Sequence, residues 1–136
     1  MFRPVESSRL GAIPVFAGLP DSDLATLAAA ATERQADEGE TVVAADDFGH
    51  ALYAIESGTA SVSADGNELR TLGPGDVFGE VAVISSGRRT ATVVATSPMQ
   101  LIALFKRDVW ELERRAPDIV ERLRALISER QPAADA

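Results

Sequence analysis

The hydrophobic positions of the chain change their period twice. Between Leu24 and Ala31 the apolar residues recur at helical spacing, and Asp21 stands where the N-cap of an amphipathic helix is expected. From Thr41 to Phe105 the apolar residues instead form short runs rich in β-branched side chains, and Gly, Asp, Asn or Pro separates the runs. We expect these runs to be strands of a sandwich or small barrel: TVVAA, HALYAIES, TASVSA, ELRTL, TATVVAT and MQLIALF.

The helical period returns after Phe105, and Pro117 divides this last region into two helices. Trp110, in the first of them, is expected to be a core or rim aromatic, as is Tyr53 in the strand region. The second helix carries one apolar stripe with charged residues beside it, and such a stripe is expected to pack against a neighbouring element. Its members are Ile119, Val120, Leu123, Leu126 and Ile127.

These patterns together predict a mainly β protein with flanking helices. The expected fold is an antiparallel β-barrel or jelly roll, with an N-terminal helical segment over 7–31, strands over 32–105 and two C-terminal helices over 106–130. The pattern shows neither an internal repeat nor a linker, so residues 1–136 are expected to form a single domain.

Composition and charge exclude several function classes. The formal net charge of −8 opposes sequence-independent binding to nucleic acid or to an anionic membrane, because clustered Lys and Arg drive both. The absence of cysteine excludes disulfides and thiolate sites, and a single histidine excludes a histidine-rich metal centre. No apolar run is long enough to span a bilayer, so we expect a cytoplasmic protein without a bound metal.

The segment DVFGEVAVISSGRRTATVVA carries residues that a plain strand pair does not need. Gly79 allows close approach of the backbone to a ligand, and a short helix beginning beside it would present free N–H groups to an anion. Arg89 opens the next strand, where its guanidinium can make a bidentate contact with phosphate. Glu80 can accept a hydrogen bond from a sugar hydroxyl. These residue types predict a site for a sugar phosphate, whereas Arg88 is expected to be solvated.

This segment resembles the phosphate-binding cassette of the cyclic nucleotide-binding domain family. The family pattern is F-G-E-x-A-(L/V), a short turn and then R-x-A-x-V, and the likeness extends from about Leu10 to Ile127. Asp46 departs from the glycine that many members have in the turn before ALYAI. The cassette positions that match are Phe78, Gly79, Glu80, Ala82, Val83, Arg89, Ala91 and Val93.

The resemblance implies a role for each cassette residue. Arg89 would hold the cyclic phosphate, Glu80 would bind the ribose 2′-hydroxyl, and backbone N–H groups near Ala82 and Thr90 would complete the phosphate site. A short helix would begin at Gly79 or Glu80, because a continued strand would use those N–H groups in its ladder. The ligand-binding residues expected within the cassette, 78–92, are Phe78, Gly79, Glu80, Val81, Ala82, Arg89, Thr90 and Ala91.

The resemblance also bears on the base and on the output. A threonine after the cassette arginine, here Thr90, is common in relatives that respond to cyclic GMP, yet some relatives with it prefer cyclic AMP, which we favour narrowly. The family usually takes an apolar lid over the base from its last helix, and Leu123 and Ile127 are the candidates here. The expected output is movement of that helix, which changes the surface that an effector protein meets.

The sequence argues against an enzyme and against a DNA-binding protein. Hydrolysis of the ligand would need a metal or an activated nucleophile with a base, and neither is visible, so no catalytic residues are expected. Direct DNA binding is not expected, because the residues after Gln131 cannot form a helix-turn-helix and the charge is acidic. The alternative is a degenerate barrel that has lost its ligand and acts as a protein-interaction module. Relatives often dimerise through the last helix, which keeps a homodimer open.

Overall fold

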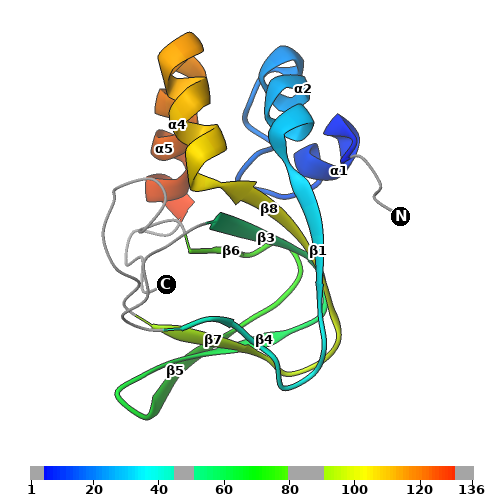
Figure 1. Cartoon of the computed structure of the whole chain (residues 1–136), viewed down its shortest axis with the longest axis vertical. Coiled ribbons are helices and arrows are strands. Elements are labelled where there is room, and N and C mark those ends of the chain that lie inside the picture. Colours follow the sequence, from blue (N-terminus) through cyan, green and yellow to red (C-terminus); the bar gives the residue numbers. More distant parts are fainter. Residues whose placement is uncertain (1–4, 45–50, 80–90, 131–136) are drawn as a thin grey trace.

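The chain folds into two stacked four-stranded sheets with helices over one of them (Figure 1). The computed structural model describes residues 5–44, 51–79 and 91–130, with side chains up to residue 126. One sheet has the strand order β1-β8-β3-β6 and the other β2-β7-β4-β5, and every pairing is antiparallel. This arrangement confirms the predicted mainly β fold with flanking helices.

All the described strands lie in the predicted region, 32–105, and they follow the predicted runs with two strands in addition to those runs. The predicted runs become β2 (Thr41–Val43), β3 (Ala51–Ser57), β4 (Ala60–Ala64), β5 (Asn67–Leu72), β7 (Thr92–Ala95) and β8 (Met99–Phe105). The additions are β1 (Thr32–Ala36) and β6 (Val77–Phe78). The sequence TERQA of β1 has no apolar alternation, and it becomes a strand by pairing in full register with β8.

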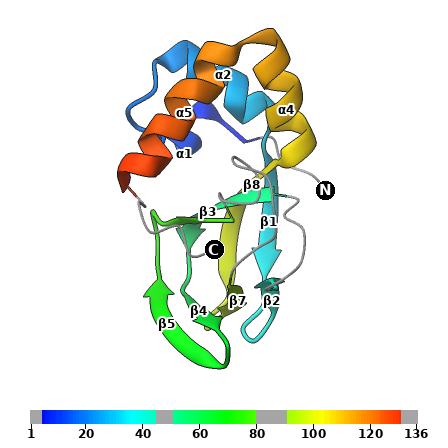
Figure 2. The same ribbon diagram turned by 90° about the vertical axis from the view of Figure 1, so that its left-hand side faces the viewer.

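The helices lie on the outer face of the β1-β8-β3-β6 sheet, as Figure 2 shows from the side. They are α1 (Ser7–Gly11), α2 (Asp21–Ala30), α4 (Lys106–Arg115) and α5 (Pro117–Arg130). The expected N-cap at Asp21 is wrong: Asp21 is the first residue of α2, and Pro20 precedes it without a side-chain capping bond. Asp21 and Asp23 instead place negative charge in the first turn, which suits the helix dipole.

The sheet beneath the helices is buried on both faces, which explains why β3 and β8 are almost continuously apolar. Leu52 and Ala54 of β3 face the helices, in one cluster with side chains of the four described helices. Tyr53 and Ile55, the alternate positions, face the second sheet and belong to a separate cluster, which we call the barrel interior. The fold therefore has two cores divided by one sheet.

The apolar stripe of α5 packs on the N-terminal helices. Ile119, Val120 and Leu123 are buried in the helical cluster, and Leu126 packs against its edge. Arg122 lies beside the stripe and binds Asp23 of α2. Its Nε lies 2.8 Å and its Nη2 lies 2.7 Å from Oδ2 of Asp23.

Among the described residues, no helix combines the length and the apolar character needed to cross a bilayer.

Candidate functional site

The two described ends of the cassette lie in different sheets. Phe78 ends β6 in the helix-covered sheet, and Ala91 directly precedes β7 in the other sheet. Both side chains are fully buried in the barrel interior. Gly79 has φ +82°, a left-handed conformation that costs residues with a Cβ about 1–2 kcal/mol. The chain therefore turns sharply just after its buried anchor, at the point where the cassette begins.

Phe78 is held in place by a chain of contacts through Tyr53 to Arg34. Its ring stacks on Tyr53 of β3 with centroids 5.3 Å apart, and the two residues are register partners. Arg34 of β1 lies over the Tyr53 ring and donates a hydrogen bond of 2.7 Å to its hydroxyl. Arg34 also binds Glu40 at 3.0 Å. The pKa of Glu40 is lowered, mainly because its carboxylate accepts a hydrogen bond from the backbone N–H of Asp37. The side-chain hydrogen bond from Arg34 lowers it further.

The turn before β6 is held by hydrogen bonds on both sides. The backbone N–H of Gly73 donates to the Asp76 carboxylate at 2.8 Å, which closes the turn of the sequence GPGD. Gly75 N–H donates to the carbonyl of Ile55 at 2.8 Å, and Ile55 N–H donates to the carbonyl of Asp76 at 2.9 Å. These bonds fix β6 against β3 although β6 has only two residues.

Arg70, which the sequence analysis did not single out, lies on the face of β5 that lines the barrel interior. Arg70 of β5 pairs with Val62 of β4, which pairs in turn with Val93 of β7, and both valines are fully buried in the interior cluster. Nε and Nη2 of Arg70 are shielded from solvent. The signal was present in ELRTL, because strand alternation places Arg70 on the same face as the buried Leu72.

A hollow of about 480 Å³ lies outside the barrel, beside α1. Arg9 and Glu56 are among the residues that line it. Arg9 donates to both carboxylate oxygens of Glu56, at 3.0 and 2.6 Å, and to Glu33 at 2.7 Å. These hydrogen bonds raise the pKa of Arg9, and the bonds to Glu56 contribute more than the bond to Glu33. Because Arg9 is already held by two carboxylates, its guanidinium does not make this hollow a phosphate site.

The family model for the cyclic nucleotide-binding domain matches residues 33–115, which include both cassette ends and all the strands after β1. The chain belongs to the cyclic nucleotide-binding domain family. The resemblance seen in the sequence is thereby confirmed, and the jelly-roll fold agrees with it.

The chain is similar to parts of longer relatives and to one structure of similar length. The cyclic AMP receptor protein of Thermus thermophilus is 34% identical over 90% of this chain, which spans 59% of that protein. The cAMP-dependent protein kinase regulatory subunit of Yarrowia lipolytica is 33% identical over 74% of this chain, which covers 24% of it. A candidate cyclic nucleotide-binding protein of Geobacter metallireducens shares the fold, with a TM-score of 0.86 and 18% identity over 96% of this chain and 98% of that one.

The expected site residues divide into placed and unplaced ones. Phe78, Gly79 and Ala91 lie at the two cassette ends, as described above. Glu80, Val81, Ala82, Arg89 and Thr90 lie outside the described residues, as do the expected cassette helix and the turn at Asp46. The roles assigned to them stay predictions.

The two lid candidates lie on α5. Leu123 is fully buried in the helical cluster and not in the barrel interior, and the side chain of Ile127 is not described. In the conformation described here, α5 is therefore packed against the helices. A lid role for Leu123 requires α5 to leave this packing.

Proposed function

We propose that the chain is a non-catalytic receptor that binds a cyclic nucleotide in the barrel and signals by movement of α5. The match of the family model to 33–115 carries this proposal, because the matched region spans the whole cassette. The described geometry supports it: a buried aromatic anchor, a left-handed glycine and a strand start in the opposite sheet bracket the cassette. Arg89 is the proposed phosphate ligand and Glu80 the proposed ribose ligand.

Cyclic AMP is the ligand that we propose first. The relatives from Thermus thermophilus and Yarrowia lipolytica are both named for cyclic AMP, and each is at least 33% identical to this chain. Thr90 is compatible with this choice, because its position does not exclude cyclic AMP in the family.

Cyclic GMP is the second candidate, and Arg70 favours it. A guanidinium only donates hydrogen bonds, and guanine offers two acceptors, O6 and N7, on one edge. Adenine offers N7 beside an amino group that is itself a donor, so it can accept only one such bond. Because Arg70 lies on the interior face of β5, a guanine edge would offer this side chain one acceptor more than an adenine edge does.

Calorimetric titration of the chain with each cyclic nucleotide tests the receptor. Arg89→Ala should weaken binding roughly 30- to 1,000-fold, because it removes a charge-assisted contact to phosphate worth about 2–4 kcal/mol. Arg88→Ala is the matched control, since it removes the same charge one residue away and should change affinity less than about twofold. If neither nucleotide binds the wild type, the alternative of a ligand-free interaction barrel replaces this proposal. Unchanged affinity in Arg89→Ala would remove Arg89 from the site.

The same titration with Arg70→Leu separates the two bases. If Arg70 contacts guanine, this variant should lose about tenfold or more in affinity for cyclic GMP and keep its affinity for cyclic AMP. Equal losses for both ligands would give Arg70 a structural role instead of a role in base choice.

Movement of α5 is tested by hydrogen exchange across residues 118–130. If the nucleotide binds the form with α5 released from α2 more tightly than the packed form, it increases the population of the released form. Hydrogen exchange in this range should then change, because the environment of α5 differs between the two forms. Unchanged exchange at saturating nucleotide, with binding shown by calorimetry, would end the α5 proposal and leave the receptor intact.

A further inference from the structure

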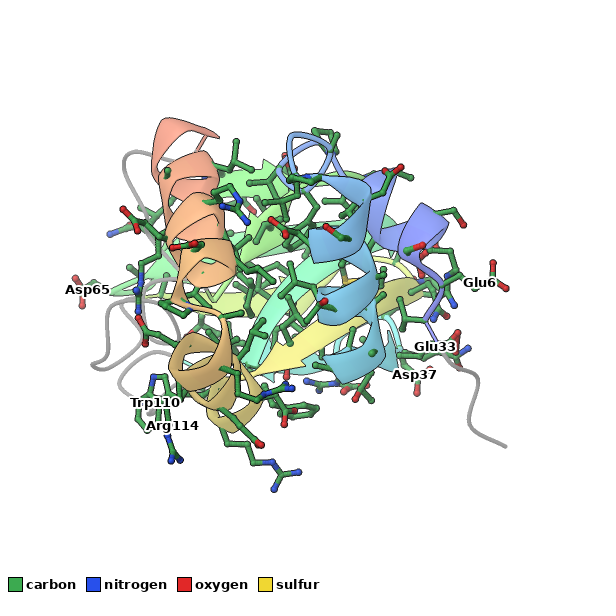
Figure 3. The ribbon with its side chains drawn as sticks, turned by 90° about the horizontal axis from the view of Figure 1, so that it is seen from above. Glu6, Glu33, Asp37, Asp65, Trp110 and Arg114 are labelled. Carbon is green, nitrogen blue, oxygen red and sulfur yellow. The ribbon has the colours of Figure 1, made fainter. Side chains whose placement is uncertain are left out.

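Trp110 lies on the surface instead of in the core or at its rim. It is the single tryptophan of the chain, its side chain is 46% exposed, and it projects from α4 beside Arg114 (Figure 3). Lys106 lies over its ring with Nζ 4.8 Å from the centroid. An exposed tryptophan loses the hydrophobic stabilisation that burial would give, and exposed aromatic residues are enriched where proteins meet partners.

Positive side chains lie on both sides of this tryptophan along α4, and the exposed Glu111 follows it in the sequence. Lys106, Trp110 and Arg114 follow one another at four-residue steps and therefore lie along one line of α4. Arg107 is exposed next to them, and a hollow of about 320 Å³ is lined by Phe105, Lys106, Arg107 and Trp110. We call Lys106, Arg107, Trp110 and Arg114 the α4 patch.

The arginines of the α4 patch differ from most others in the described part of the chain. Arg9, Arg34, Arg122 and Arg124 each form an ion pair with a carboxylate. For Arg107 and Arg114, no carboxylate of the described residues lies within ion-pair distance. The acidic residue Glu113 of α4 is held by Arg124 of α5. The α4 patch thus carries three positive side chains, against one exposed carboxylate beside it at Glu111, on a chain whose net charge is −8.

We propose that the α4 patch is a docking site for a short acidic segment of a partner protein that carries an apolar side chain. Two guanidinium groups match carboxylates, and the Trp110 ring with its hollow matches an apolar side chain between them. An extended polyanion is a poorer partner, because the chain as a whole carries a net charge of −8. A short segment stays within about 10 Å of the α4 patch. At an ionic strength of about 0.1 M, charges that lie farther away than this are largely screened.

Trp110 itself reports binding, since it is the only tryptophan. The full chain would be titrated with a short synthetic peptide of glutamates that contains two leucines, while the fluorescence of Trp110 is followed. We expect saturable quenching or a spectral shift, and affinity that falls as salt is raised. A peptide with lysine in place of each glutamate should not bind. Anionic phosphatidylserine vesicles and single-stranded DNA are the comparison ligands.

Two matched variants decide whether the α4 patch is the site. Arg114→Glu and Arg115→Glu change the same charge at neighbouring exposed positions, but only Arg114 shares the line of Trp110. Arg114→Glu should weaken peptide binding about tenfold, and Arg115→Glu less than twofold, with helical circular dichroism and cyclic nucleotide affinity unchanged in both. Equal effects of the two variants, no response of Trp110, or tighter binding to vesicles or DNA than to the peptide would each overturn the proposal.

Discussion

The ion pair between Arg122 and Asp23 allows α5 to be loosened without a change in the barrel. Both bonds reach the same oxygen of Asp23, whose side chain is 7% exposed, whereas that of Arg122 is 45% exposed. Removing one partner of a fully buried pair costs about 3–5 kcal/mol, and an exposed pair contributes about 0.2–1 kcal/mol. Because one partner is buried and the other half-exposed, we expect Arg122→Ala to lower the free energy of unfolding by about 1–2 kcal/mol.

The same substitution should raise nucleotide affinity. If the ligand prefers the form with α5 released, weakening the packed form by about 1–2 kcal/mol moves the population toward the form that binds better. The gain in affinity then has an upper bound of roughly 5- to 30-fold. A variant that is less stable and yet binds more tightly is the expected signature.

Urea denaturation and calorimetry measure these two effects separately. Arg115→Ala is the control, because Arg115 is exposed on α4 and forms no ion pair with a described residue, so it should alter neither quantity appreciably. Asp23→Ala should act in the same direction as Arg122→Ala, and the double variant should show that their effects are not additive. Lower affinity in Arg122→Ala, with its loss of stability confirmed, would refute the idea that α5 leaves α2 on binding.

Three further predictions concern the framework of the site. Gly58→Ala should lower the free energy of unfolding, measured by urea denaturation, by about 1–3 kcal/mol more than Gly39→Ala does. Both glycines have positive φ, but a Cβ at Gly58 would lie 2.3 Å from a backbone oxygen, whereas a Cβ at Gly39 would meet open space. Equal losses in the two variants would contradict this prediction. Phe78→Ala should lower the free energy of unfolding by about 3–5 kcal/mol and Phe78→Leu by less, and a small effect of the alanine variant would show that the anchor is dispensable. The hydrogen bond from Arg124 lowers the pKa of Glu113, so this pair stabilises the fold above the ordinary pKa, about 4.3, and the stability is lost as pH falls through the lowered value. Stability measured from pH 6 to pH 3 should therefore converge between the wild type and Glu113→Gln, and a constant difference would exclude the ion pair as its cause.

The sequence by itself determined most of the secondary structure and the family. The change from helical period to short β-branched runs predicted the main strands. A short, almost continuously apolar run such as MQLIALF is typical of a strand in a sheet that is buried on both faces. The spacing of Gly79, Glu80 and Arg89 marked the cassette, because few sites need a close backbone, an acid and a guanidinium within so short a stretch. These are local signals that a single segment carries.

Tertiary structure decided which partner each face meets. TERQA became β1 only because β8 offers it a paired edge, and the stripe of α5 packs on the N-terminal helices although its period is equally compatible with a barrel lid or a dimer. The positions of Arg70 on the interior face of β5 and Trp110 on the surface likewise depend on long-range packing. The physical reason is that a periodic pattern states which face is apolar, whereas the element that covers this face is fixed by contacts distant in sequence.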